Sequence, residues 1–250
     1  MSSVSSVMSI EKAFSIIEII CKHGPMGITE LSKISGLNKT TAFRIISTLL
    51  NLGYIEQDSL TKKYNITFKF LKISSKSLSD TNIIKYAKPK LKALSEFTGE
   101  TVHLVERSDN EIIYIGKHES SKNSVRMVSR VGLSLPMIRT AVGKAIMATL
   151  SEEETEEIWN NSEIIKKTPK TITDLSEFKA ELEKIKKTGF ATDIEENEEG
   201  VICVAAAVKD IAGEYKYAIS VSAPSSRMNL NNIKTIGSAV LKTAHELSDY

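Results

Sequence analysis

The first fifty residues carry apolar side chains at helical spacing, interrupted by short stretches that contain glycine or proline. Residues 9–23 form one such segment, and the stretch HGPMG after it predicts the end of a helix. The segment ITELSKIS predicts a second helix, with Leu31 and Ile34 facing inward. The apolar face of the first helix consists of Ala13, Ile16, Ile17 and Ile20.

A third helix is predicted in NKTTAFRIISTLLNLG, directly after the short turn SGLNK. Gly36 suits this corner because glycine adopts positive φ angles without steric cost. Asn38 is a typical N-cap, and Gly53 ends the helix. Two short helices joined by a glycine-containing turn indicate a helix-turn-helix. The buried stripe of the third helix is predicted to consist of Ala42, Ile45, Ile46, Leu49 and Leu50.

The side chains outside that stripe have the chemistry of a surface that reads DNA. In helix-turn-helix proteins the N-terminal end of this helix enters the major groove. Arginine can pair with guanine, threonine can meet a base edge or a thymine methyl group, and lysine can neutralise phosphate. We therefore predict that double-stranded DNA contacts Lys39, Thr40, Thr41, Phe43, Arg44 and Ser47.

The segment YIEQDSLTKKYNIT after Gly53 predicts a hairpin of two strands around a polar turn. Lys62 and Lys63 occur near its tip, where their charges suit a phosphate backbone. Together these elements predict a winged helix-turn-helix domain in residues 1–67. The alternative interpretation is an ordinary three-helix domain with a solvated, mildly basic face.

The rest of the chain predicts a linker helix in residues 68–87 and an α+β domain in residues 88–250. Pro89 is expected to open or kink the helix PKLKALSEFTG. Two strands are expected around a turn at Asp109, another at Val125 to Val128, and two more in GVICVAAAVKD and YKYAISVSAP. Alternation of such strands with amphipathic helices predicts an antiparallel sheet flanked by helices.

Charge is distributed unevenly between these parts. Residues 1–80 hold ten Lys/Arg and six Asp/Glu, whereas the remaining residues hold 23 and 25. A basic end joined to a mildly acidic body suggests that one end meets a polyanion. Cys21 and Cys203 lie far apart, and the four histidines lack metal-ligand spacing, so neither a disulfide framework nor a metal or other cofactor is expected. The sequence shows neither a long apolar run nor the pattern of a secretory leader. We therefore expect a cytoplasmic location and no membrane partner.

Two further motifs do not by themselves predict a function. The segment TAVGKA is similar to part of a phosphate loop but lacks the G-x-x-x-x-G-K-[ST] spacing, which argues against nucleotide binding. The acidic run Glu195, Glu196, Glu198 and Glu199 is interpreted as a solvated loop, with a cation site as the open alternative.

Over nearly its whole length the chain resembles the IclR family of transcription regulators. The resemblance rests on ITELSKISGLNKTTAFRIISTLLNLGYI, PKLKALSEFTGETVHLV, LPMIRTAVGKAIMA, TGFATDIEENEEGVICVAAAVKD and YAISVSAPSSR, in this order. It implies a winged-helix domain, a linker helix and a GAF-like effector domain, in homodimers or homotetramers that bind operator DNA, often as repressors. It also implies a small organic-acid effector, such as a carboxylate or a sugar acid, in carbon metabolism.

The resemblance carries over to individual effector-site residues. The backbone of Ala141, Val142 and Gly143 matches a segment that lines the site in carboxylate-binding members, where amides at a helix start would favour an anion. The matching polar side chains are Asp193, Cys203, Ser220 and Ser222. Ile202 stands where the family often has arginine, which leaves the effector open.

Structural roles remain open for each of these residues. Serines in a strand are often satisfied by backbone, Cys203 can be a small core residue, and Asp193 can cap a turn. For the whole protein, two other functions compete with effector-controlled DNA binding. One is a hydrolase that uses Cys203 or Ser220, although a recognisable nucleophile motif is lacking. The other is a DNA-binding regulator whose C-terminal domain only oligomerises.

Overall fold

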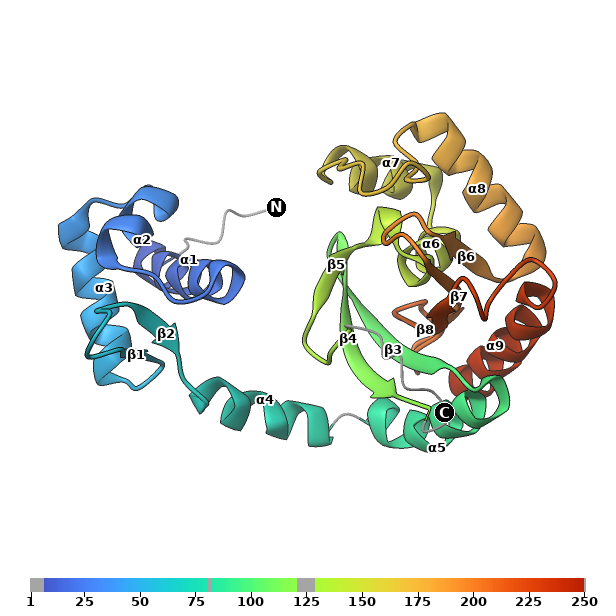
Figure 1. The fold of residues 1–250 in the computed structure, drawn as a ribbon, viewed down its shortest axis with the longest axis horizontal. Coiled ribbons are helices and arrows are strands. Elements are labelled where there is room, and N and C mark those ends of the chain that lie inside the picture. The colour runs from blue at the N-terminus through green and yellow to red at the C-terminus, as the bar shows by residue number, and fades with distance from the viewer. Residues whose placement is uncertain (1–6, 81, 121–128, 250) are drawn as a thin grey trace. The chain divides into compact units, whose positions relative to one another are not determined.

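Contacts within the chain divide it into two units, Met1–Asp80 and Thr81–Tyr250. The computed structural model describes residues 7–80, 82–120 and 129–249. Figure 1 gives the order of their helices and strands. The first unit contains α1 (Met8–His23), α2 (Ile28–Ser35), α3 (Lys39–Asn51), β1 (Ile55–Gln57), β2 (Tyr64–Ile66) and α4 (Lys69–Asp80).

The first unit is built on a core that α1, α2, α3 and the hairpin share. Gly36 takes the expected left-handed conformation, with φ of 68°, between α2 and α3. Leu31 is fully buried, but Ile34 is 45% exposed, so the prediction that it faces inward is wrong. Among the described residues, the core shared with α1 and α3 includes Leu31 but not Ile34. In α3 the predicted stripe is confirmed, with Ala42, Ile46 and Leu49 buried and with Ile45 and Leu50 partly buried.

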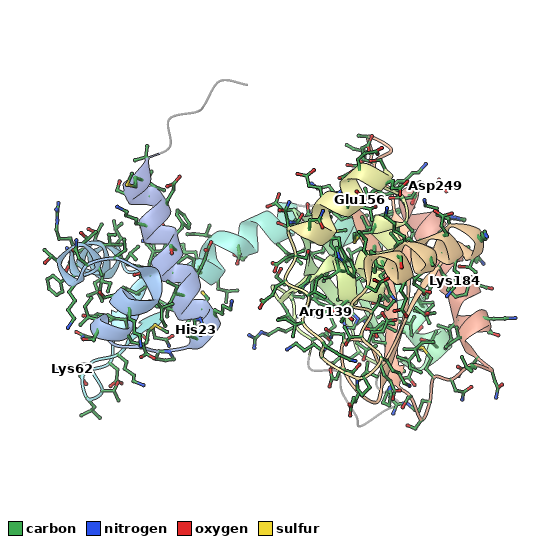
Figure 2. All side chains as sticks on the ribbon, turned by 90° about the horizontal axis from the view of Figure 1, so that it is seen from above. His23, Lys62, Arg139, Glu156, Lys184 and Asp249 are labelled. Atoms are coloured by element: carbon green, nitrogen blue, oxygen red, sulfur yellow. The ribbon has the colours of Figure 1, made fainter. Side chains whose placement is uncertain are left out.

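The predicted hairpin is present between α3 and α4. Strands β1 and β2 pair in antiparallel register, with Ile55 opposite Ile66 and Gln57 opposite Tyr64. Asp58 orders the turn because its carboxylate accepts hydrogen bonds from the backbone of residues 60 and 61, at 3.0 and 2.6 Å. Lys62 has a φ of 57°, and it lies at the tip of the hairpin in Figure 2.

The predicted linker, residues 68–87, is divided between the two units, with residue 81 outside the described residues. Helix α4 belongs to the first unit, and α5 (Asn82–Thr98) belongs to the second. The reason is burial: Ile83 and Ala87, which the prediction assigned to the linker, are fully buried in the core of the second unit. Pro89 lies inside α5 and does not open it.

The described residues of the second unit form one six-stranded sheet in the order β5-β4-β3-β8-β7-β6, with every neighbouring pair antiparallel. This confirms the predicted α+β class. Residues 125–128, where another strand was expected, lie outside the described residues. The strands are β3 (Thr101–Ser108), β4 (Glu111–His118), β5 (Ser134–Pro136), β6 (Ala191–Ile194), β7 (Val201–Val208) and β8 (Tyr217–Pro224).

Helices cover both faces of this sheet and form two separate cores (Figure 1). Helices α5 and α9 (Ile233–Ser248) pack on one face. On the other face lie α6 (Ala141–Met147), α7 (Glu152–Asn160) and α8 (Leu175–Thr188), with a short 3-10 turn, Met137–Arg139, before α6. Among the described helices, none combines the length and the apolar character that crossing a membrane requires.

Candidate DNA-binding and effector-binding sites

The six predicted DNA-contacting residues of α3 all lie outside its buried stripe. Asn38 caps the helix, because its side-chain oxygen accepts a hydrogen bond from the backbone of Thr41 at 2.8 Å. This cap confirms the predicted start and fixes the first turn. The hairpin residues Lys62 and Lys63 are also exposed. On α3 the exposed residues are Lys39, Thr40, Phe43 and Arg44, and the partly buried ones are Thr41 and Ser47.

Part of this surface also faces an apolar groove of about 1050 Å³ within the first unit. Ile10 and Phe14 of α1 and Ile73 of α4 line it. Phe43, which is 58% exposed, lines it as well. A role of Phe43 in this apolar groove therefore competes with its predicted contact to DNA. The other predicted DNA-contacting residues along the groove are Thr41, Arg44 and Ser47.

In the second unit, strand register aligns four polar side chains across four strands. Thr101 in β3 lies opposite Ser222 in β8, which lies opposite Cys203 in β7. Cys203 in turn lies opposite Asp193 in β6. Cys203 packs against the core that contains α6, which places the row on the α6 side of the sheet. Three of the predicted effector-site residues are thus neighbours.

A second row, two residues further along β3 and β8, brings His103 opposite Ser220. His103 Nδ1 lies 3.4 Å from the hydroxyl oxygens of both Ser220 and Ser222. Its Nε2 lies 2.7 Å from the hydroxyl of Ser129, and its ring meets Tyr114 edge-on at 5.0 Å between centroids. Burial, followed by the charge of Lys117, lowers the pKa of His103 to about 3. The imidazole is therefore neutral at physiological pH.

The two rows together form a polar cluster, which consists of His103, Tyr114, Asp193, Cys203, Ser220 and Ser222. Asp193 provides its carboxyl group and is only 5% exposed. Its Oδ1 accepts hydrogen bonds from the backbone amides of Glu196, at 2.7 Å, and Asn197, at 3.4 Å. Burial and the nearby charge of Glu196 raise the pKa of Asp193 to about 6. A carboxyl group with such a pKa can accept or donate a hydrogen bond near neutral pH.

The cysteine and tyrosine of the cluster are held in their neutral forms. Cys203 donates a hydrogen bond to the Ser222 hydroxyl at 3.1 Å. Burial, followed by the charge of Asp193, raises the pKa of the Cys203 thiol. Burial also raises the pKa of Tyr114, with smaller effects of Cys203 and Asp193. The cluster therefore offers hydroxyl and thiol groups that remain protonated.

The segment at the start of α6 is buried against the same core, but one of its amides is not free. The backbone N–H of Gly143 donates to the hydroxyl of the N-cap residue Thr140 at 3.1 Å. A side chain at Gly143 would bring its Cβ to 2.1 Å from the carbonyl oxygen of Met137, so glycine is required by close packing. The expectation that this amide faces an anion is wrong for Gly143. For Ala141 and Val142 it remains a prediction.

Among the described residues, the two cations whose charges act on His103 or Asp193 are both paired. Lys117 Nζ contacts the carboxylate of Glu119 at 2.7 Å and the carbonyl oxygen of Ser129 at 2.6 Å. Lys144 Nζ lies 2.6 Å from a carboxylate oxygen of Glu196. The charges of both lysines are therefore largely compensated by groups of the protein itself.

The geometry does not support activation of Ser220 as a nucleophile. A general base near neutral pH would need a higher pKa than that of His103, and catalytic histidines are usually oriented by a carboxylate. Here Nε2 of His103 meets the hydroxyl of Ser129 instead. The raised pKa of Cys203 likewise disfavours the reactive thiolate.

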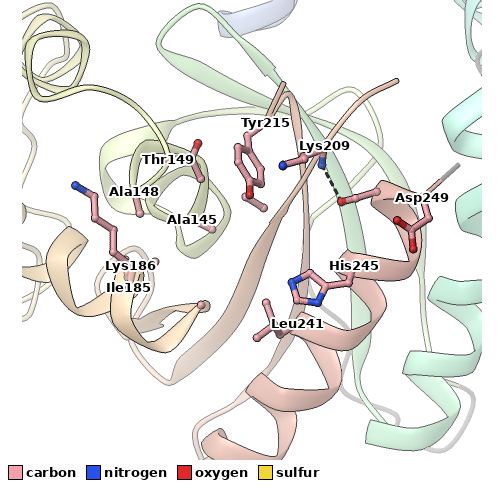
Figure 3. Close-up of a pocket in the computed structure, with 13 residues that line it drawn as sticks. Ala145, Ala148, Thr149, Ile185, Lys186, Lys209, Tyr215, Leu241, His245 and Asp249 are labelled. Carbon is pink, nitrogen blue, oxygen red and sulfur yellow. Dashed lines mark hydrogen bonds between the residues drawn. The ribbon is translucent and has the colours of Figure 1, made fainter. Parts of the chain in front are cut away.

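A separate cavity of about 570 Å³ opens between α6, α8, α9 and the β7–β8 turn. Figure 3 shows Tyr215, Lys209, His245 and Asp249 around it, with Leu241 and Ala145 among its apolar residues. None of the predicted effector-site residues lines it.

Comparison with known proteins identifies the family. The family model of the bacterial transcriptional regulator IclR C-terminal domain matches residues 75–249, and that of the IclR helix-turn-helix domain matches residues 9–59. The chain belongs to the IclR family. Its members act as DNA-binding transcription regulators, and the predicted resemblance is confirmed.

Relatives of this IclR-family chain match it over almost its full length. The HTH-type transcriptional regulator KdgR of Dickeya chrysanthemi is 34% identical over 98% of this chain and 80% of its own length. The DNA-binding transcriptional repressor YiaJ of Escherichia coli is 35% identical over 96% of this chain and 86% of its own length. The crystal structure of Thermotoga maritima IclR, 32% identical, covers 98% of both chains with a TM-score of 0.71.

Several residues around the cluster of this IclR-family protein were not predicted from its sequence. His103 and Tyr114 lie in strands, where aromatic side chains are common for packing alone. Lys144 and Glu196 belong to motifs that were noticed but given no role. The sequence signal for Lys144 was its apolar flanking residues. They indicate a buried helix, in which a lysine needs a charged partner.

Proposed function

We propose that this chain represses or activates transcription by binding operator DNA through α3 and the hairpin, under the control of a small organic acid. The acid binds on the α6 side of the sheet, beside Asp193, Cys203, Ser220 and Ser222, with the start of α6 as a further wall. The observation that carries this proposal is the alignment of polar side chains from four strands on one buried face.

The chemistry of the cluster favours a monocarboxylate with hydroxyl groups, such as a sugar acid of carbon metabolism. Neutral hydroxyl, thiol and imidazole groups supply hydrogen bonds, and Asp193 adds an acceptor or donor. The known relatives support regulation by DNA binding, and the family fold supports assembly into homodimers or homotetramers. An effector that binds one arrangement of the subunits more tightly than another favours that arrangement. The difference between its binding free energies for the two arrangements limits the change in operator affinity.

Effector binding is tested by thermal unfolding of the full chain with a panel of sugar acids, 2-oxo acids and dicarboxylates. A ligand at about 100 times its Kd stabilises the native state by about 2.7 kcal/mol. We expect a hydroxylated monocarboxylate to raise the Tm, and the double substitution Ser220→Ala/Ser222→Ala to abolish that rise without changing effector-free DNA binding. If no acid raises the Tm, the oligomerisation-only alternative is favoured.

DNA recognition is tested with Arg44→Ala on the promoter of the chain's own gene and on selected duplexes. We expect a loss of about 1–3 kcal/mol on a specific site. Lys22→Ala, which removes the same charge from an exposed position at the end of α1, is the matched control. Equal binding by Arg44→Ala and the unsubstituted protein would remove Arg44 from the recognition surface.

A further inference from the structure

Two motifs that the sequence left without a role meet in the second unit. Lys144, the lysine of TAVGKA, is fully buried in α6. Its Nζ lies 2.6 and 2.8 Å from the two carboxylate oxygens of Glu196, in the acidic run. Glu181 of α8 lies further away, at 4.0 Å. The sequence-based interpretation of the acidic run as a solvated loop is therefore wrong for Glu196, which is buried. Its cationic partner is the ammonium group of Lys144.

Glu196 is fixed by its backbone as well as by its side chain. Its N–H donates to Oδ1 of Asp193 at 2.7 Å. Its carbonyl oxygen accepts a hydrogen bond from the hydroxyl of Thr171 at 2.6 Å. Thr168 donates to the neighbouring carbonyl, that of Glu195, at 2.6 Å. Residues 195–200, the acidic loop, are thus attached to α6, to Asp193 and to the segment before α8.

The Lys144–Glu196 pair joins two walls of the candidate effector site. Lys144 directly follows Ala141, Val142 and Gly143 in α6, and Glu196 holds the loop that begins after Asp193. Both hydrogen bonds recorded for the Asp193 carboxylate end on Oδ1. Across the described residues no hydrogen bond ends on Oδ2, so Oδ2 is the oxygen that can meet a ligand.

The pair also acts on Asp193 electrostatically, in opposite directions. Glu196 raises the pKa of Asp193, and Lys144 lowers it. An isolated buried charge is costly, and each member of the pair partly cancels the charge of the other. Removal of either member therefore leaves the other to shift the pKa of Asp193 alone. Among the described residues, the titratable groups that interact electrostatically with Asp193 are Lys144 of α6, Glu196 of the acidic loop, Cys203 of β7 and Tyr114 of β4.

We propose that Lys144 and Glu196 are positioning residues of the effector site, which hold the acidic loop against α6 and decide whether Asp193 meets an effector as acceptor or as donor. This inference rests on the proposed function of the site. An ionised Asp193 accepts a hydrogen bond from an effector hydroxyl group. A protonated Asp193 donates one to an effector carboxylate, so the pair selects which end of a sugar acid lies against β6.

The experiment titrates carboxyl groups by NMR in the full-length protein without any ligand, with Asp193→Asn used to assign Asp193. In Glu196→Gln, the unpaired Lys144 charge should make Asp193 release its proton about one pH unit lower. In Lys144→Met, Asp193 and Glu196 become an uncompensated carboxyl pair, which should release its last proton about one pH unit higher. The hydrogen-bonded amides of Glu196 and Asn197 should exchange faster in both variants.

Opposite shifts support the inference, because loosening of the loop alone would move both titrations in the same direction. Shifts of the same sign, or none, would overturn it. Lys170→Met is the matched control, since it breaks a more exposed ion pair to Glu195 on the same loop and should leave Asp193 unchanged. If Lys144→Met does not fold, Lys144→Gln makes the same measurement. Because no effector is added, failure here is distinct from failure of the acid panel.

Discussion

The surface of α3 and the polar cluster on the α6 side of the sheet are both rich in hydroxyl groups, but they differ in burial. On α3 the charged side chains are exposed and come from one helix, so each interacts mainly with water. In the cluster, His103, Ser220 and Ser222 are buried and come from two strands. Substitutions on α3 should therefore change DNA affinity with little effect on folding, whereas substitutions in or beside the cluster should change stability and its pH dependence.

The largest effect is expected for Lys144→Met, which leaves Glu196 buried without its cation. Removal of one partner from a buried ion pair typically costs about 3–5 kcal/mol of unfolding free energy. Urea denaturation measures this loss, and Lys170→Met, on the more exposed pair, should cost much less. Similar losses in the two variants would contradict the difference in burial.

The next effect is the acid sensitivity of the cluster through His103. Its folded pKa of about 3 lies below the ordinary value of 6.5, so between these values the unfolded chain binds more protons. Stability from this group is therefore complete above pH 6.5 and is lost as the pH falls toward 3, by at most about 1.4 kcal/mol per pH unit. Urea unfolding at several pH values should show a weaker acid destabilisation in His103→Gln.

Asp193 should change the unfolding free energy with pH in the direction opposite to His103, and it therefore serves as a control for the His103 prediction. Its folded pKa of about 6 lies above the ordinary 3.8, so the native state binds more protons between these values. Its contribution therefore falls as the pH rises through this window. Asp193→Asn should make the protein more sensitive to acid, and an identical pH profile for His103→Gln and Asp193→Asn would refute the assignment.

A smaller effect is expected at the start of α3, where local structure supports the exposed surface. Asn38→Ala removes the acceptor for the Thr41 amide and should cost about 1 kcal/mol of unfolding free energy. Asn51→Ala, at the exposed end of the same helix, should change it by less than about 0.5 kcal/mol. Calorimetry distinguishes the two, and equal values would mean that the cap contributes nothing.

The smallest change in stability is expected at the hairpin tip. Lys62→Gln and Lys63→Gln should leave the Tm unchanged, because both side chains are exposed. Each should lower the slope of log affinity against log salt by about one if it contacts phosphate. Fluorescence anisotropy with an operator duplex at several salt concentrations measures the slope. An unchanged slope in both variants would place the hairpin away from DNA.

Sequence alone was sufficient for the features that depend on near neighbours in the chain. The stripe of α3, the turn at Gly36 and the cap at Asn38 each involve residues within a few positions of one another, so spacing and residue type identify them. The motifs in order also identified the IclR family. Local pattern was insufficient for Ile34, Ile83 and Ala87, whose burial depends on what packs against them.

Tertiary structure decided the polar cluster and the pair beside it. Ser220 reaches His103 across 117 positions of sequence, and Lys144 reaches Glu196 across 52. Strand order and register create these contacts, and no short pattern encodes which distant strand will lie alongside. The same contacts remove the groups from water, and that desolvation, rather than residue type, gives His103 and Asp193 their shifted pKa values.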